Sequence, residues 1–196
     1  MTKKRIAIFA SGSGSNAEKI AEYFTNHPTI EVSLILSNNP QAGVIARARK
    51  FQIPVVLFDR KTFYETNKIT ELLQNQHIDL IVLAGFMMLI PEEMVKAFPQ
   101  KMVNIHPALL PKYGGKGMYG HFVHEAVVAA HETESGITIH FVNEHYDEGA
   151  IIFQASCPVV SADTPEDVAQ KVQVLEHKHY PAVIEKTLSA LNQPED

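Results

Sequence analysis

The sequence has a single cysteine, no long hydrophobic run and no excess of basic residues. Cys157 alone excludes an intramolecular disulfide framework and a zinc ribbon. Only five uncharged residues separate Arg5 from Ser11, which is too short for the core of a signal peptide, and no run approaches the length that spans a membrane. We therefore expect a cytoplasmic protein without a membrane partner.

The charge of the chain excludes a further class of partner. The formal net charge is −5, and acidic and basic residues are interspersed. No basic stripe is present to neutralise phosphates, so we expect no nucleic-acid partner. A local group of hydrogen-bond donors can still bind a small anionic ligand.

The order of apolar and helical segments predicts an α/β fold. Apolar strand-like runs alternate with helical spacing, and almost continuous apolar strands are typical of a parallel sheet covered on both faces. Right-handed crossovers then give a doubly wound sheet. The strands are predicted at 5–10, 32–36, 55–58, 80–84 and 102–106, and the helices at 17–24, 44–50 and 68–75.

The last third of the chain predicts a different arrangement. Segments 136–142 and 150–155 have the pattern of an antiparallel pair of strands, after a helix at 122–130. Thr164 is a good N-cap for a final helix, which Pro181 should kink or interrupt. We see no linker, repeat or low-complexity stretch. The expectation is one domain over residues 1–196, with a doubly wound, mostly parallel sheet and an antiparallel C-terminal part.

A glycine-rich turn follows the first predicted strand. Residues 12–17 (GSGSNA) satisfy the G-x-G-x-x-G/A pattern of dinucleotide-binding turns. The carboxylate that holds a ribose about twenty residues later is missing, because 37–40 reads SNNP, and the P-loop lysine is also missing. What remains is a helix start with free N–H groups, suited to a phosphate monoester. A tight turn that binds nothing would show the same pattern.

Two polar side chains stand at the end of the strand predicted at 102–106. Asn104 and His106 lie on the same side of that strand, at the edge where α/β sheets bind ligands. An amide donor beside an imidazole suits a carbonyl oxygen that becomes negative during attack. Asp147 lies in a turn far along the chain. If it reached His106 it would stabilise the imidazolium and raise the pKa of that histidine, but a surface turn explains it equally well.

Other chemistries have weaker signals. The sequence has neither a G-x-S-x-G nucleophile turn nor an H-E-x-x-H zinc motif. The pairs His121 with His124 and His177 with His179 lack cysteine or carboxylate partners at a familiar ligand spacing, so we expect no metal. Residues 86–90 (FMMLI) are either a cofactor wall or ordinary core.

Together these motifs resemble the phosphoribosylglycinamide formyltransferases over nearly the whole chain. The NIHP-x-LLP block with a later D-x-G is specific for enzymes that use formyl folate. The matching segments are SGSGSN at 11–16, LAGFM at 83–87, NIHPALLPKY at 104–113, HFVNEHYDEGAII at 140–152 and LEHKHYP at 175–181.

The resemblance implies an activity and a catalytic trio. The formyl group of 10-formyltetrahydrofolate, a co-substrate, would pass to the amine of N1-(5-phospho-D-ribosyl)glycinamide in de novo purine (IMP) biosynthesis. Asn104 and protonated His106 would stabilise the oxyanion of the tetrahedral intermediate, and Asp147 would keep His106 charged. By the same resemblance, 1–100 is the nucleotide- and phosphate-binding half and 101–196 the catalytic and folate-binding half.

The resemblance also implies binding residues. For the nucleotide they are Gly14, Ser15 and Asn16 at the phosphate, with Gln173 and Glu176 at the amine and ribose. For the folate they are Arg60 (or Lys61) at the glutamate carboxylate, and Met87, Met88, Leu89, Ile90, Asn104, Asn143 and Asp147 around the pterin. Two features depart from the common pattern. Met88 replaces an arginine of many relatives, and the segment 113–124 is longer, so His121 and His124 receive no role.

Competing functions remain open at this point. Transfer to methionyl-tRNA would use the same catalytic residues, but it normally requires a further C-terminal domain and a basic surface. A formyltetrahydrofolate hydrolase would carry a regulatory domain before the first strand. A nicotinamide-binding module is opposed by the missing ribose carboxylate, and a simple phosphate-binding protein would leave Asn104, His106 and Asp147 unused. We expect small-molecule partners and a monomer or homodimer.

Overall fold

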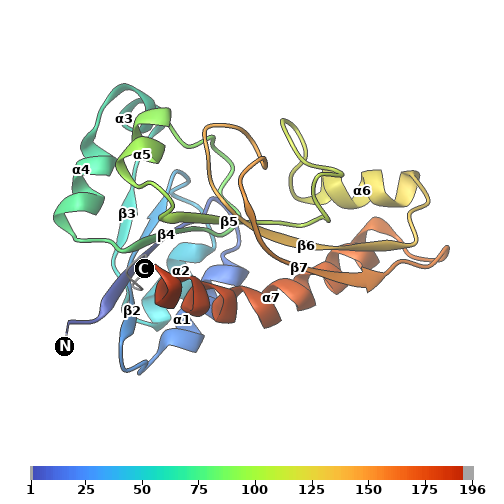
Figure 1. Ribbon diagram of the computed structural model, residues 1–196, viewed down its shortest axis with the longest axis horizontal. Helices are drawn as coiled ribbons and strands as arrows, with labels where there is room; N and C mark the ends of the chain where they lie inside the picture. The colour runs from blue at the N-terminus through green and yellow to red at the C-terminus, as the bar shows by residue number, and fades with distance from the viewer. Residues whose placement is uncertain (1, 192–196) are drawn as a thin grey trace.

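The computed structural model describes residues 2–191, which form one seven-stranded sheet with helices on both faces (Figure 1). The strand order is β3-β2-β1-β4-β5-β6-β7. The first five strands pair in parallel, while β6 pairs antiparallel with β5 and β7 antiparallel with β6. The predicted fold class is confirmed. The strands are β1 (Lys4–Phe9), β2 (Ile30–Ser37), β3 (Val55–Leu57), β4 (Leu80–Leu83), β5 (Met102–His106), β6 (Glu134–Phe141) and β7 (Ile151–Pro158).

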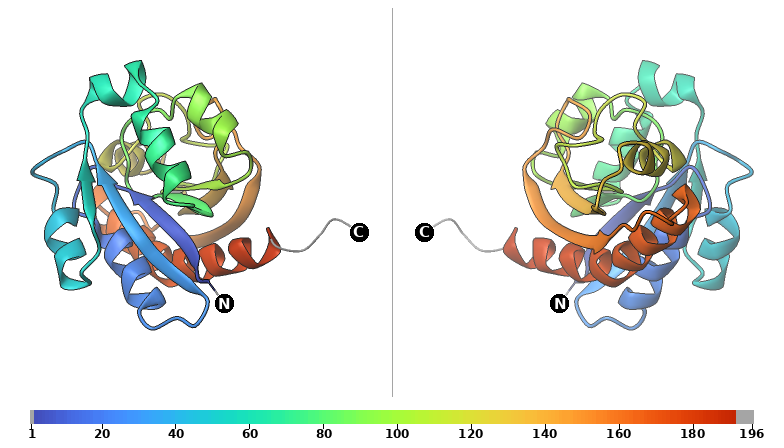
Figure 2. Two further views of the ribbon diagram at one scale, coloured as in Figure 1. Left: turned by 90° about the vertical axis from the view of Figure 1, so that its left-hand side faces the viewer. Right: turned by 90° about the vertical axis from the view of Figure 1, so that its right-hand side faces the viewer.

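Alternating side chains of the central strand β1 pack into two separate hydrophobic cores, one on each face of the sheet. In β1, Ile6 and Ile8 belong to one buried cluster, and Ala7 and Phe9 to the other. Both faces of the sheet are therefore apolar, and both are covered by helices, as the two views along the molecule show (Figure 2). The first cluster includes side chains of α1 (Ser15–Phe24), α2 (Val44–Lys50), α6 (His121–Ala129) and α7 (Pro165–Ala190). The second includes side chains of α3 (Arg60–Glu65), α4 (Lys68–Asn75) and α5 (Glu92–Ala97).

The sequence pattern missed two helices and misjudged a third. Helices α3 and α5 have six residues each, with one buried side chain apiece, so they show no apolar period. The predicted cap at Thr164 is confirmed as a capping box with Asp167. Of the two outcomes expected at Pro181, the interruption is wrong, because α7 continues through it to Ala190. A kink there stays a prediction. Pro181 is buried, and the packing of this helix outweighs the local cost of a proline.

Tyr180 fixes α7 to the edge of the sheet where the strands end. Its ring is fully buried, and its hydroxyl donates to the carbonyl oxygens of Leu83, at 2.9 Å, and Val103, at 3.2 Å. These carbonyls belong to β4 and β5, the neighbouring strands that lead into the polar loops. One hydroxyl thus links α7 to both strands.

Replacing Tyr180 with phenylalanine tests this link. Tyr180→Phe should lower the free energy of unfolding by about 1–3 kcal/mol, because the carbonyls of Leu83 and Val103 lose a buried hydrogen-bond donor. Urea denaturation measures the change. Tyr23→Phe is the control, since Tyr23 is 44% exposed and its hydroxyl donates to the carboxylate of Glu185 at the surface. Equal, small losses in the two variants would show that the buried hydroxyl has no special role.

Candidate active site

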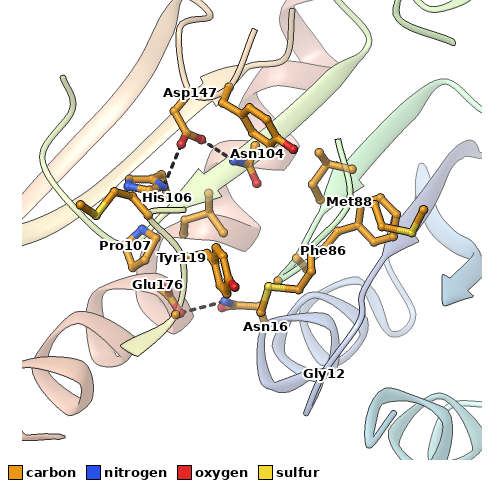
Figure 3. Close-up of a pocket in the computed structure, with 18 of the residues that line it drawn as sticks. Gly12, Asn16, Phe86, Met88, Asn104, His106, Pro107, Tyr119, Asp147 and Glu176 are labelled. Carbon is orange, nitrogen blue, oxygen red and sulfur yellow. Dashed lines mark hydrogen bonds and ion pairs between the residues drawn. The ribbon is translucent and has the colours of Figure 1, made fainter. Parts of the chain in front are cut away.

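A cavity of about 660 Å³ opens at the carboxyl ends of β1, β4 and β5 (Figure 3). In this sheet the connections from β1 lead to one side through β2 and to the other through β4, and such a reversal is where α/β sheets bind ligands. Every site residue predicted from the sequence lines this cavity except Arg60. The predicted residues in the lining are Gly14, Ser15, Asn16, Met87, Met88, Leu89, Ile90, Asn104, His106, Asn143, Asp147, Gln173 and Glu176.

One end of the cavity is the start of α1. Gly14 has φ +75°, and a Cβ atom there would lie 2.5 Å from Cβ and 2.6 Å from Cα of Val44. Only glycine fits both the backbone angle and the space. Within residues 2–191, no side chain caps the N-terminus of α1 by a hydrogen bond. The helix dipole and its first N–H groups therefore face the cavity without a built-in partner, an arrangement suited to an anion.

A partly buried polar pair lies beside this helix start. Asn16 Nδ2 donates to Glu176 Oε2 at 2.8 Å, while Asn16 Oδ1 is buried without a hydrogen-bond partner among the described residues (Figure 3). Gln173 Nε2 lies 3.4 Å from Ser15 Oγ. Burial raises the pKa of Glu176, and the bond from Asn16 only partly opposes it. This corner can thus bind a group that donates hydrogen bonds as well as one that accepts them.

The other end of the cavity brings Asn104, His106 and Asp147 together (Figure 3). His106 Nδ1 lies 3.5 Å from Asp147 Oδ2, and Asn104 Nδ2 lies 3.5 Å from Asp147 Oδ1. The backbone N–H of Gly115 donates to Asp147 Oδ2 at 3.0 Å. The long-range contact that the sequence left open is therefore present, and it is made by a residue with φ +56°, a backbone angle that aspartate tolerates.

The second nitrogen of His106 fixes its tautomer. Nε2 lies 2.7 Å from the carbonyl oxygen of Tyr113, which can only accept, so Nε2 carries a proton. The nitrogen that gains or loses a proton is then Nδ1, the one that faces Asp147. Both nitrogens of His106 are engaged within the protein, and a direct hydrogen bond from His106 to a ligand requires one of these contacts to open.

Burial, and not Asp147, decides the pKa of His106. Burial lowers it, Asp147 and the carbonyl of Tyr113 raise it, His140 lowers it, and the net direction is down. The expectation of a raised pKa is therefore wrong for the net value, although Asp147 acts in the expected direction. The pKa of Asp147 behaves differently. Burial would raise it, but the hydrogen bond to His140, the charge of His106 and the Gly115 N–H together lower it.

Two histidines of the cavity were missed or left without a role. His140 Nδ1 lies 2.8 Å from the carbonyl oxygen of Phe141, and its Nε2 lies 3.2 Å from Asn104 Nδ2. His140 pairs with Asn104 across β5 and β6, a register that the sequence alone does not reveal. His124, on α6 (His121–Ala129), is buried with Nδ1 unpartnered among the described residues. Its position on the buried face with Val123 and Val127 was the available signal.

The wall between the two ends is apolar. It is formed by the segment after β4, residues 86–90, together with Val142. Phe86 packs edge-on to Phe9 at 5.2 Å between ring centroids, and Ile90 is buried, whereas Met87 is 53% exposed. Some side chains of this segment therefore belong to the core and others face the cavity, and its role as a cofactor wall stays a prediction.

Arg60 lies elsewhere. Its guanidinium carbon sits 4.9 Å from the centroid of the Tyr64 ring, and it is not part of the cavity lining. Its contact with a folate carboxylate stays a prediction that this arrangement does not support.

The division of the chain into two functional halves also stays a prediction. Met87, which is expected at the folate, belongs to the first half, and Glu176, which is expected at the nucleotide, belongs to the second. The residues expected at each ligand are therefore not confined to one half.

Two further features concern metals and membranes. Within residues 2–191, no three histidine, cysteine, aspartate or glutamate side chains are grouped so that they could hold a metal ion. In the same part of the chain, no helix combines the length and the apolar character needed to cross a bilayer.

Comparison with known proteins identifies the family. The formyl transferase family matches residues 4–184. This chain belongs to the formyl transferase family, and the resemblance seen in its motifs is confirmed.

Three of its relatives within the family carry the same name. The phosphoribosylglycinamide formyltransferase of Bacillus subtilis is 38% identical, over 98% of each chain. The chloroplastic phosphoribosylglycinamide formyltransferase of Arabidopsis thaliana is 42% identical over 93% of this chain, which spans only 64% of that relative's length. The crystal structure of the enzyme of that name from Bacillus halodurans has a TM-score of 0.84 and 37% identity, covering 98% of this chain and 97% of its own.

Neutralising Asp147 tests the electrostatic link within the site. Asp147→Asn should lower the pKa of His106 further, because burial then acts without the opposing carboxylate, so the neutral imidazole persists to lower pH. An NMR titration of the His106 ring measures this pKa. Asp163→Asn, which removes a carboxylate that pairs with Lys171 instead, should leave it unchanged. An unaltered pKa in Asp147→Asn would contradict the link.

Proposed function

We propose that this protein transfers the formyl group of 10-formyltetrahydrofolate to the amine of N1-(5-phospho-D-ribosyl)glycinamide, a step of de novo purine (IMP) biosynthesis. The observation that carries the proposal is one cavity that joins an uncapped helix start to the group of Asn104, His106 and Asp147. The names of the relatives support the same reaction.

The nucleotide is proposed to lie along the polar side of the cavity. Its phosphate would accept hydrogen bonds from the backbone at Gly14, Ser15 and Asn16, where only glycine fits the first position. Its amine and ribose would meet Gln173 and the partly buried pair of Asn16 with Glu176. The unpartnered Asn16 Oδ1 gains a donor in this arrangement, which removes a buried unsatisfied group.

The folate is proposed to lie against the apolar wall. The pterin ring would contact Met87, Met88, Leu89 and Ile90, while Asn104, Asn143 and Asp147 offer polar groups at its edge. This arrangement brings the formyl carbon to the group around His106, next to the nucleotide amine. No metal is required for the chemistry that follows.

Formyl transfer then proceeds through a tetrahedral intermediate. The amine nitrogen forms a bond to the formyl carbon, and the electron pair of the C=O bond moves to the oxygen. The Asn104 amide stabilises that oxyanion, and a protonated His106 adds a positive charge nearby. The attacking amine supplies the proton that charges the His106–Asp147 pair, and this pair then gives a proton to N10 of the folate. The electron pair of the oxyanion re-forms the C=O bond as the C–N10 bond breaks. The products are the formylated amine and tetrahydrofolate.

Turnover with different acceptors tests the proposed function. With 10-formyltetrahydrofolate as donor, N1-(5-phospho-D-ribosyl)glycinamide should give the highest kcat/KM, well above methionyl-tRNA or water. Formation of tetrahydrofolate, followed by absorbance, measures all three reactions. Faster transfer to methionyl-tRNA, or faster hydrolysis by water, would show that the proposed acceptor is wrong. No turnover with any of the three would refute formyl transfer itself.

Removing the amide of Asn104 tests its catalytic role. Asn104→Ala should lower kcat by about 10²–10³-fold with little change in KM, since an oxyanion donor acts mainly in the transition state. Steady-state kinetics, with thermal melting as a check of folding, give the result. A kcat close to that of the wild type, with chemistry rate-limiting, would remove Asn104 from the mechanism.

A further inference from the structure

The cavity has little positive charge for a site that would hold two anionic ligands. Among the lysines and arginines within residues 2–191, only Lys116 belongs to its lining. Two carboxylates, Asp147 and Glu176, line the same space. The phosphate monoester and the folate carboxylates of the proposed substrates thus meet one fixed cation and one helix dipole, which is equivalent to about half a charge.

Lys116 is available to a ligand. Its side chain is exposed, and it forms no ion pair or hydrogen bond with the residues that the structure describes. Lys112, four residues earlier, is different, because its Nζ lies 2.8 Å from Glu132 Oε1 and it does not line the cavity. The two lysines share a segment but not an environment.

The backbone holds Lys116 beside the catalytic group. Gly115 and Gly117 flank it with φ values of +91° and +92°, in the left-handed region that favours glycine. The N–H of Gly115 bonds to Asp147 Oδ2, and the carbonyl of Gly115 accepts from the N–H of Met118 at 3.1 Å. The backbone at Lys116 is therefore held next to Asp147, while its ammonium group has no partner among the residues that the structure describes.

We propose that Lys116 is a substrate-binding residue whose ammonium contacts an anionic oxygen group of a substrate. The group is either the phosphate monoester of the nucleotide or a glutamate carboxylate of the folate. The inference rests on the proposed function, and it assigns a role to the segment 113–124 that the sequence left without one. Arg60, the cation expected at the folate carboxylate, lies outside the cavity, so Lys116 is the cation that the fold supplies.

Kinetics of three variants test the role of Lys116. Lys116→Gln should raise the KM of one substrate by about 10- to 100-fold and leave kcat within about twofold, because a charge-assisted hydrogen bond is lost in the ground state and the transition state alike. Lys116→Arg should recover most of the loss. Lys112→Gln is the matched control and should behave like the wild type. The penalty should also shrink at high salt, since the contact is partly exposed.

Two comparisons distinguish the source of the anion. If the phosphate is the partner, Lys116→Gln should weaken competitive inhibition by inorganic phosphate and leave the KM of the folate unchanged. If a glutamate carboxylate is the partner, the KM penalty should disappear with a 10-formyltetrahydropteroate that lacks glutamate. KM values within about twofold of the wild type for both substrates, or a loss of kcat alone, would overturn the proposal.

Binding measurements separate this inference from the proposed function. Titration calorimetry with inorganic phosphate and with 10-formyltetrahydrofolate compares the wild type with Lys116→Gln without any turnover. Weaker binding of one of these ligands supports Lys116 as an anion contact even if the acceptor of the reaction is another amine. Unchanged binding of both contradicts the role of Lys116 even if the proposed reaction is observed.

Discussion

The arrangement of the catalytic end of the cavity depends on the carboxylate of Asp147, whose side chain is only 11% exposed. An isolated charge in this position would be strongly destabilising, and hydrogen bonds or opposite charges must compensate for its lost hydration. Its compensating contacts come from three separate parts of the chain: Gly115 after β5, Asn104 and His106 within β5, and His140 on β6. The lowered pKa of Asp147 shows that these contacts together exceed the cost of burial. The carboxylate of Asp147 thereby links its own loop and the loop at Gly115 to strands β5 and β6.

Two opposing influences act on the pKa of His106. Desolvation favours the neutral ring, and Asp147 favours the charged one. Between these two influences on the pKa of His106, desolvation prevails. Under the proposed function, an oxyanion that forms beside the ring adds a further negative charge, which shifts the balance toward the imidazolium. The site then acquires its positive charge as the negative charge appears, and an uncompensated buried cation does not have to be maintained beforehand.

Local rules account for what the sequence predicted, and tertiary contacts for what it could not. The helix start at Gly14 and the strand end at Asn104 follow from glycine, alternation and the polarity of parallel sheets, which operate over a few residues. The tautomer of His106 depends on the carbonyl of Tyr113, and the partner of Asn104 depends on the register of β6. Helices α3 and α5 are too short for a periodic signal. The net pKa of His106 was misjudged because burial depends on every segment packed around the ring, whereas the sequence indicated only a candidate partner.

One helix joins the polar end of the cavity to the core. Val172, Glu176 and Tyr180 follow one another at four-residue steps, so they lie on one face of α7. Along that face Val172 contributes to the first core cluster, Glu176 bonds to Asn16 on α1, and Tyr180 bonds to the carbonyls of β4 and β5. A shift or rotation of α7 would therefore disturb all three together. The continuity of the helix through Pro181 follows from this constraint, because a break there would separate the C-terminal anchor in the core, Ile184 and Leu188, from the carboxylate that faces the cavity. The position of Glu176 relative to the ends of β4 and β5 is thus set by packing that lies outside the cavity itself.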